Sequence, residues 1–247
     1  MEKDFHKKHY MAEGTHWFLR ARRAFLIGFF RGQDFKSKIL EVGCSGGLFI
    51  KELHDLGFVG AFGVDINNDA VRYGKERGID KIQTADGNHL PFLDGEFDFV
   101  VSSDVLEHIQ FEDKALREWH RILREGGELL LTVPAFRFLW SEHDVANQHY
   151  RRYTRMMLAA VLRRNGFRVV RSSYWNFFLF LPIFIIRLIG KFMSIFTGTK
   201  NKPQDQLIDF GRYLNAILEG ILRLENFLLL KGINFPFGVS VFVIAKK

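Results

Sequence analysis

A short apolar run, a glycine-rich turn and a helical repeat follow one another between Lys38 and Asp65 (KILEVGCSGGLFIKELHDLGFVGAFGVD). The opening run has the length and the continuous apolar character of a buried parallel strand. Glycines in the turn 43–47 let the backbone approach a ligand closely, and apolar side chains recur at helical spacing over 48–56. A second strand, 61–64, ends on Asp65, whose carboxylate can accept hydrogen bonds from ribose hydroxyls. The segment therefore predicts a β-turn-α-β unit with a nucleoside site at its first turn.

The spacing of the glycine turn argues against a nicotinamide cofactor. A dinucleotide fingerprint has the form G-x-G-x-x-G. The turn here reads G-x-S-x-G, with Gly43, Ser45 and Gly47 at the defining positions. A dehydrogenase or reductase of the Rossmann type is therefore disfavoured.

Polar groups follow several predicted strands at the point where each strand ends. Asp86 follows a third strand, and Ser102–Asp104 follow a fourth. Strands of about five apolar residues that alternate with helices predict an α/β fold with a doubly wound, mostly parallel sheet. Ligands bind at the carboxyl ends of such strands, so these groups should line one site together with the glycine turn and Asp65.

Composition narrows the class of protein further. The chain has 247 residues, which is enough for one α/β domain with an elaboration, and its single cysteine, Cys44, excludes a disulfide framework and a Cys-based zinc site. The N-terminus is charged and has no apolar segment of the signal-peptide kind, which predicts a cytoplasmic location. The net charge of +7 does not choose between partners, but the basic residues lie beside apolar ones, so we expect no nucleic acid partner.

Residues 36–170 and the last strand, 238–245, resemble the class I methyltransferases that depend on S-adenosyl-L-methionine (SAM). The phrases EVGCSGG, GVDIN, TADGNHLPF, FDFVVSSDVLEHI and LREGGELLLTVP match, in order and spacing, the large family that includes the ubiquinone and menaquinone biosynthesis methyltransferases. Ser45 stands where that family most often has glycine. The resemblance implies an enzyme that uses SAM as cofactor. It also implies a Rossmann-like sheet of seven strands with the last strand antiparallel.

The resemblance also implies roles for individual residues at the cofactor site. The turn backbone would hold the methionine moiety and ribose, Asp65 the ribose hydroxyls, Ile66 the adenine face and Asp86 the adenine amino group. The complete set comprises Glu41, Gly43, Cys44, Ser45, Gly47, Asp65, Ile66, Asp86, Gly87 and Ser103.

Two further groups of residues could contribute to chemistry. Asp104, Glu107 and His108 would share one face at the start of a helix predicted over 105–123. Some quinone-pathway O-methyltransferases with similar residues bind a divalent ion there. The same Glu-His pair is common in family members without a metal, however, so we expect a structural role and no metal.

The second group follows the fifth predicted strand, where the acceptor should lie. It contains the candidate bases His143 and His149 and the candidate acceptor-binding residues Trp140, Arg151, Arg152 and Tyr153. A base is required only if the acceptor loses a proton, whereas the arginines could hold a phosphate or carboxylate. In the alternative interpretation, the arginines pair with surface acids and the tyrosines pack.

Segments outside the core pattern are strongly apolar. Residues 14–31 predict an amphipathic helix over the cofactor, with arginines that could also meet an anionic substrate or lipid. Residues 174–237 separate the last two strands and predict two apolar helices without an obvious place in the core. The first is too short in uninterrupted apolar length to span a membrane, but Arg187 and Lys191 suit an interfacial helix whose cations reach the head groups. This insertion could bind a membrane surface, form a dimer interface or cap an apolar acceptor tunnel.

The sequence thus predicts four parts: an N-terminal helical cap (1–35), a SAM-binding core (36–173), a hydrophobic insertion (174–237) and a final core strand (238–247). The predicted function is methyl transfer by O- or C-methylation to a small, lipophilic or lipid-linked acceptor, at the inner face of the membrane. The alternative is a membrane-associated scaffold that has the methyltransferase fold without catalysis.

Overall fold

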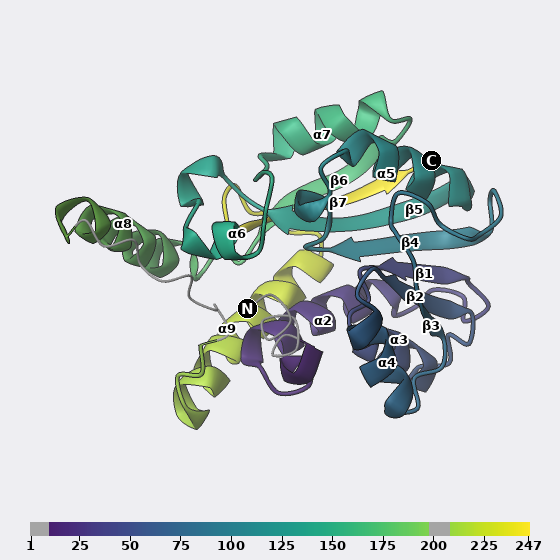
Figure 1. Ribbon diagram of the computed structural model, residues 1–247, viewed down its shortest axis with the longest axis horizontal. Helices are drawn as coiled ribbons and strands as arrows, with labels where there is room; N and C mark the ends of the chain where they lie inside the picture. The colour runs from purple at the N-terminus through teal and green to yellow at the C-terminus, as the bar shows by residue number, and fades with distance from the viewer. Residues whose placement is uncertain (1–9, 198–207) are drawn as a thin grey trace.

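The structure, a computed structural model, describes residues 10–197 and 208–247, with side chains given for all of these except 191–197. Its centre is a seven-stranded sheet in the order β3-β2-β1-β4-β5-β7-β6 (Figure 1). The strands are β1 Ile39–Val42, β2 Ala61–Asp65, β3 Ile82–Thr84, β4 Phe97–Ser103, β5 Leu123–Pro134, β6 Arg168–Trp175 and β7 Ser240–Lys246.

Strand direction agrees with the predicted fold class. The pairs among β3, β2, β1, β4 and β5 are parallel, and β7 runs antiparallel between β5 and β6. Val42 is in register with Val64 of β2 and with Ser102 of β4. Because the central strands end level with one another, the residues that follow them meet at one edge of the sheet, as the sequence predicted.

Helices cover both faces of the sheet, with α5 and α7 on one face and α2, α3, α4 and α9 on the other (Figure 1). Their bounds are α2 Trp17–Phe30, α3 Leu48–Asp55, α4 Asn68–Glu76, α5 Glu112–Ile122, α6 Glu142–Ala146, α7 Arg155–Arg164, α8 Phe180–Thr197 and α9 Arg212–Leu230. Each face has its own apolar cluster. Trp119 is fully buried in the cluster on the α5 and α7 face, and Phe25 is fully buried in the cluster on the opposite face. Two 3-10 turns, Leu106–His108 and Arg137–Leu139, precede the loops at the ligand edge.

The helix predicted over 105–123 is interrupted. Leu106–His108 forms a 3-10 turn, and α5 begins only at Glu112. Two acids in the first turn, Glu112 and Asp113, favour the start of α5 there because their negative charges are attracted to the positive end of the helix dipole. The chain enters β5 at Leu123, directly after α5. The predicted helix is therefore confirmed for 112–122 and wrong for 105–111.

Helix α9 is part of the core, so the expectation that neither insertion helix would find a place there was wrong for α9. Leu222 and Leu229 join the apolar cluster beneath the sheet. The amide nitrogen of Asn226 donates to the carbonyl of Ala21 in α2 (2.8 Å), and its oxygen accepts from the indole of Trp175 in β6 (2.8 Å). These buried hydrogen bonds fix α9 and α2 to each other and to the sheet.

Helix α8 projects from the rest of the protein (Figure 1). Ile183 and Phe184 touch the domain, whereas a set of large apolar side chains is between 45% and 68% exposed: Leu181, Ile185, Ile186, Leu188 and Ile189. We predicted that Arg187 reaches lipid head groups. In the structure its guanidinium instead donates to the carbonyl of Leu139. The side chain of Lys191 lies outside the described residues. Within the described segments, no helix is both long and apolar enough to cross a bilayer.

Candidate active site

The glycine turn between β1 and α3 has a backbone path that side chains disfavour. Gly43 and Gly47 have φ values of 84° and 78°, in the left-handed region. A Cβ on Gly43 would also overlap the Val105 side chain. The amides of Gly43 and Cys44 both donate to the carbonyl of Val64 (2.8 and 2.9 Å), which ties the turn to the end of β2. The turn thus places backbone, rather than side chains, at the ligand edge.

Asp65 joins this turn to the start of α4. One carboxylate oxygen accepts from the Ser45 amide (2.7 Å) and the other from the Asn67 amide (2.8 Å). The carboxylate is partly exposed at this edge, and a carboxylate has about four acceptor positions. Ile66, the next residue, is apolar and 73% exposed. A carboxylate beside an uncovered apolar side chain suits a ribose with its attached base.

Two buried acids lie behind the same turn. Glu41 is 7% exposed and its Oε2 has no hydrogen-bond partner among the described residues. Burial, followed by the charge of Glu13, raises the pKa of Glu41 well above its usual range. Glu13 accepts from the Gly46 amide (3.1 Å) through Oε1, while its buried Oε2 also lacks a described partner. Burial raises the pKa of Glu13 as well. A ligand with a cationic group would satisfy both acids.

Sequence reasoning placed Glu41 at this site but missed Glu13. Glu13 precedes α2 and lies far from the turn in the chain, and no motif marks it. The only signal was that the N-terminal helix was expected to cover the cofactor.

The remaining predicted cofactor residues also lie at the ligand edge. Asp86 is exposed and accepts from the backbone and side-chain nitrogens of Asn88 (both 2.9 Å). The carbonyl of Gly87 accepts from the indole of Trp119 (3.0 Å). Ser103 shares a hydrogen bond with the hydroxyl of Thr132 (2.8 Å). Cys44 is a free, buried thiol whose pKa burial raises well above its usual range, so it contributes packing rather than reactivity.

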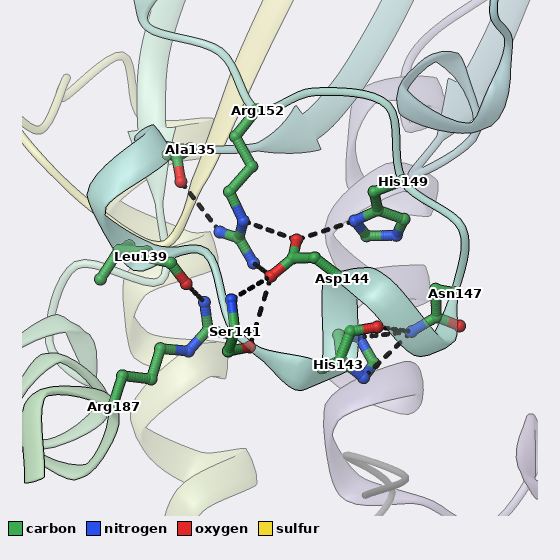
Figure 2. Close-up of polar contacts among 9 residues, drawn as sticks. All are labelled: Ala135, Leu139, Ser141, His143, Asp144, Asn147, His149, Arg152 and Arg187. Atoms are coloured by element: carbon green, nitrogen blue, oxygen red, sulfur yellow. Dashed lines mark hydrogen bonds and ion pairs between the residues drawn. The ribbon is translucent and has the colours of Figure 1, made fainter. Parts of the chain in front are cut away.

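The segment after β5 is organised around Asp144, a fully buried carboxylate (Figure 2). It accepts from the guanidinium of Arg152 at both oxygens (2.6 and 3.1 Å) and from Nδ1 of His149 (2.9 Å). The Ser141 amide donates to it as well (2.8 Å). Burial alone would raise the pKa of Asp144, but the hydrogen bonds from His149 and Arg152 outweigh it and lower the pKa. Sequence reasoning gave Asp144 no role.

Most of the predicted acceptor-binding residues are engaged inside the protein. Arg152 is buried against Asp144, and the hydroxyl of buried Tyr153 donates to Glu112 (2.6 Å). Burial and this hydrogen bond raise the pKa of Tyr153. Arg151 is partly buried, bonded to the Gln110 carbonyl (2.6 Å) and paired with Glu112 (3.1 Å). The alternative interpretation expected pairs with surface acids, whereas the acid that pairs with Arg152 is fully buried. Only Trp140, partly buried after the second 3-10 turn, has no described ion pair or side-chain hydrogen bond.

The two candidate bases differ in their surroundings. The His143 ring lies against the side-chain nitrogen of Asn147 (3.0 Å), and burial lowers its pKa to about 3, so it is a weak base. His149 is held through Nδ1 by Asp144, and its other ring nitrogen points away from that carboxylate (Figure 2). Its ring meets that of His108 edge-on, with centroids 4.5 Å apart. Of the two, His149 is the histidine whose ring orientation is fixed by a buried carboxylate.

Asp104, Glu107 and His108 do not share a helical face, contrary to the prediction. Asp104 has a φ of 53° and pairs with Arg22 of α2, while Glu107 and His108 lie on the 3-10 turn that follows. Arg22 is thus one of the arginines of the N-terminal helix that bind acids of this protein. The others are Arg20, paired with Glu219, and Arg23, paired with Glu52.

Comparisons with known proteins agree with this geometry. Residues 40–131, from β1 through most of β5, match the methyltransferase domain family. That segment contains the glycine turn, Asp65, Asp86 and Ser103. Residues 40–131 of the chain are therefore a methyltransferase domain.

Curated relatives of the methyltransferase domain match over part of their length. An uncharacterised protein of Methanocaldococcus jannaschii is 36% identical over 98 residues, which are 40% of this chain and 45% of the relative. The ubiquinone/menaquinone biosynthesis C-methyltransferase UbiE of Cupriavidus pinatubonensis is 32% identical over 91 residues, 35% of this chain and 37% of the relative. The chain therefore spans less than half the length of these curated relatives.

Solved structures share the fold over nearly the whole chain. A methyltransferase solved in complex with the Haloferax volcanii activator Trm112 has a TM-score of 0.63 at 15% identity, covering 99% of this chain and 94% of that chain. A SAM-dependent methyltransferase from Archaeoglobus fulgidus has a TM-score of 0.59 at 19% identity, covering 96% and 98%. These likenesses extend the shared fold beyond the methyltransferase domain to the helices around it.

The ligand edge fits SAM, the cofactor of this family. The phosphoethanolamine N-methyltransferase 2 of Haemonchus contortus, with a TM-score of 0.58 at 18% identity over 91% of this chain and 52% of that chain, was solved in complex with it. In the present protein, one oxygen each of Glu41 and Glu13 lacks a hydrogen-bond partner among the described residues and suits a positively charged group, and the exposed Ile66 suits an aromatic base.

Proposed function

We propose that this protein transfers a methyl group from SAM to a lipophilic or lipid-linked acceptor. The observation that supports the cofactor part of this proposal is the arrangement around Asp65, whose partly exposed carboxylate anchors both the glycine turn and the start of α4 at the ligand edge. The bound cofactor would supply an electrophilic methyl group. Glu41, Asp65, Asp86 and the turn backbone would hold it, with Ile66 against the adenine.

The residues of the chain would promote transfer mainly by position. Displacement of a methyl group from a sulfonium is an in-line reaction, so holding the acceptor in near-attack geometry supplies much of the rate. If the acceptor atom is a hydroxyl, its proton must leave, and His149 is the base in our proposal because Asp144 fixes its ring through Nδ1. His143 is less suitable, since burial has lowered its pKa to about 3. Trp140 would form part of the acceptor wall.

The lipophilic acceptor is inferred from α8. Its exposed apolar side chains lie on a helix that projects from the fold, and exposed apolar area of this kind marks a surface for an apolar partner. The basic net charge of +7 adds attraction to anionic lipid. We therefore propose peripheral binding to an anionic membrane, with an acceptor taken from that membrane. Dimerisation through α8 is the competing explanation for its exposed face.

The cofactor half predicts that Asp65→Ala weakens binding of S-adenosylhomocysteine about 10- to 100-fold. The reason is the loss of charge-assisted hydrogen bonds, each of which contributes about 1.5–3 kcal/mol. Isothermal titration calorimetry measures the affinity directly. Asp80→Ala, an exposed acid without a described partner near β3, is the matched control and should bind as the wild type does.

Absence of S-adenosylhomocysteine binding to the wild-type protein would refute the enzyme and leave the scaffold alternative. Binding that survives Asp65→Ala unchanged would refute the site. With binding established, transfer of labelled methyl from SAM to extracted membrane lipids would identify the acceptor class.

The proposed membrane binding predicts that the double variant Ile186→Glu with Ile189→Glu no longer co-sediments with phosphatidylglycerol vesicles. Both residues are exposed, by 68% and 53%, and burying a charged carboxylate in the interface opposes binding. Val59→Glu, at an equally exposed apolar position (75%) between α3 and β2, is the control and should sediment normally. The dimer interface would be favoured instead if the wild-type protein did not sediment with vesicles, eluted as a dimer in size-exclusion chromatography, and became a monomer on the two α8 substitutions.

A further inference from the structure

Three potential metal-binding side chains that are not among the predicted cofactor residues lie close together. Glu107 and His108 come from the 3-10 turn after β4, and His149 comes from the loop after α6. One ligand atom of each lies within 4.8 Å of the others. The grouping was not visible in the sequence, where Asp104 was expected beside Glu107 and His108. In the structure, Asp104 is paired with Arg22 instead.

The burial of Glu107 is the strongest indication that an ion or ligand binds to this group of side chains. The residue is 0% exposed, and neither carboxylate oxygen has a hydrogen-bond partner in the described part of the chain. A buried carboxylate without hydrogen bonds is costly, and native proteins rarely contain one without a compensating ion or ligand. The charges of Arg152 and Arg22 act on Glu107, but these arginines are hydrogen-bonded to Asp144 and to Asp104 instead.

His149 is held in the orientation that a metal ligand needs. Its Nδ1 is bonded to Asp144 (2.9 Å), which leaves Nε2 on the side away from that carboxylate (Figure 2). Histidines that bind metals usually donate their other ring nitrogen to a carboxylate in this way, because the contact fixes the tautomer and ring direction. Asp144 is in turn fixed by Arg152 and Ser141. The second histidine, His108, is exposed, and its ring meets that of His149 edge-on.

The ligand set selects the type of ion. Two imidazoles with one carboxylate suit a transition metal, whereas magnesium and calcium prefer oxygen ligands throughout. A His₂Glu set leaves a coordination position for water or substrate on Zn²⁺. Zinc bonds of about 2.0–2.2 Å place tetrahedral ligand atoms about 3.4 Å apart. The distances between the ligand atoms here, up to 4.8 Å, would shorten to that value if the exposed side chain of His108 rotated towards Glu107 and His149.

We infer that Glu107, His108 and His149 bind one Zn²⁺ ion. Metal binding itself does not depend on the proposed function. If methyl transfer is also correct, the ion would contact the acceptor, because the three residues lie where β4 and the segment after β5 reach the ligand edge. His149 would then act on the acceptor as a zinc ligand in place of a free base.

The test is calorimetric titration of chelator-treated, full-length protein with zinc chloride, followed by Co²⁺ as a visible-absorption probe of tetrahedral geometry. We expect one equivalent bound with micromolar or tighter affinity. Glu107→Gln and His108→Asn should each weaken it by more than about 100-fold, since even outer-shell partners contribute 10–100-fold. His89→Asn, an exposed histidine in the β3–β4 connection, is the control for adventitious histidine binding and should match the wild type.

S-adenosylhomocysteine affinity and the thermal midpoint are measured on the same samples. Both should stay near wild type in His108→Asn, whose side chain is exposed, so a folding defect cannot imitate metal loss. Zinc affinity that is equal in the wild type, Glu107→Gln and His108→Asn would overturn the inference. That result would leave the cofactor site intact, because retained S-adenosylhomocysteine binding distinguishes the two failures.

Discussion

Asp144→Ala should lower the free energy of unfolding by about 3–5 kcal/mol, because it leaves a buried charge without its partner. Arg152 is 5% exposed, and its guanidinium donates to Asp144 at both oxygens, with a third bond to the carbonyl of Ala135 (2.9 Å). Urea denaturation followed by far-ultraviolet circular dichroism measures the loss. Glu142→Ala, an exposed acid on the same short helix, is the control and should change stability by less than about 0.5 kcal/mol.

A double variant separates the pair from its surroundings. In Asp144→Leu with Arg152→Met, both charges are gone and apolar groups fill their space, so much of the lost stability should return. A double variant as unstable as Asp144→Ala would mean that the bonds to His149 and Ser141, and not the ion pair, hold this segment. A single variant within 1 kcal/mol of the wild type, against the expected loss of about 3–5 kcal/mol, would contradict the structure of the Asp144 cluster.

The free energy of unfolding should depend on pH through the same Asp144 cluster. The pKa of Asp144 is lowered in the folded state, so the unfolded chain takes up a proton first as pH falls. The stability that Asp144 contributes is therefore complete at neutral pH and is lost progressively below about pH 4, the ordinary aspartate pKa. The difference between wild type and Asp144→Ala should shrink over that acidic range and stay constant above it.

The sheet and its ligand edge could be predicted from sequence because both depend on local patterns. Buried parallel strands are continuous apolar runs, and the register of β1 with β2 and β4 then brings their ends level. Gly43, Asp65 and Ser103 needed no further information to be placed at one edge. Ile66 is exposed and Asp65 is bonded to the turn, but the cofactor roles that the family resemblance implied for both stay predictions.

Polar residues that become buried were the main source of error. The segment from Ser141 to Tyr153 is rich in charge and reads as an exposed loop, but Asp144 and Arg152 are buried because they neutralise each other. The buried side of α9 likewise includes Glu225 and Asn226, and Glu225 accepts from the backbone amides of Phe177 and Phe178 (2.9 and 3.2 Å). Such pairings depend on tertiary contacts, which hydrophobic periodicity does not encode.

Gly43→Ala should both destabilise the protein and remove most of its affinity for S-adenosylhomocysteine. A side chain at φ 84° costs about 1–2 kcal/mol, and the overlap of its Cβ with Val105 adds about 1–3 kcal/mol of overpacking. Relief of that overlap must displace either the turn or Val105, which follows Asp104 at the end of β4. We expect affinity to fall more than about 10-fold, since a tenfold change needs only 1.4 kcal/mol. Calorimetric titration and urea denaturation measure the two effects separately.

Gly78→Ala isolates the backbone contribution from the steric one. Gly78 has nearly the same φ, 78°, but an added Cβ there meets no atom within 4 Å. Its variant should lose only the conformational cost of about 1–2 kcal/mol and keep wild-type affinity. Adding Val105→Ala to Gly43→Ala removes the atoms that the new Cβ meets, so part of the affinity should return. If Gly43→Ala is as stable as Gly78→Ala and also binds S-adenosylhomocysteine normally, the glycine turn does not form the cofactor site.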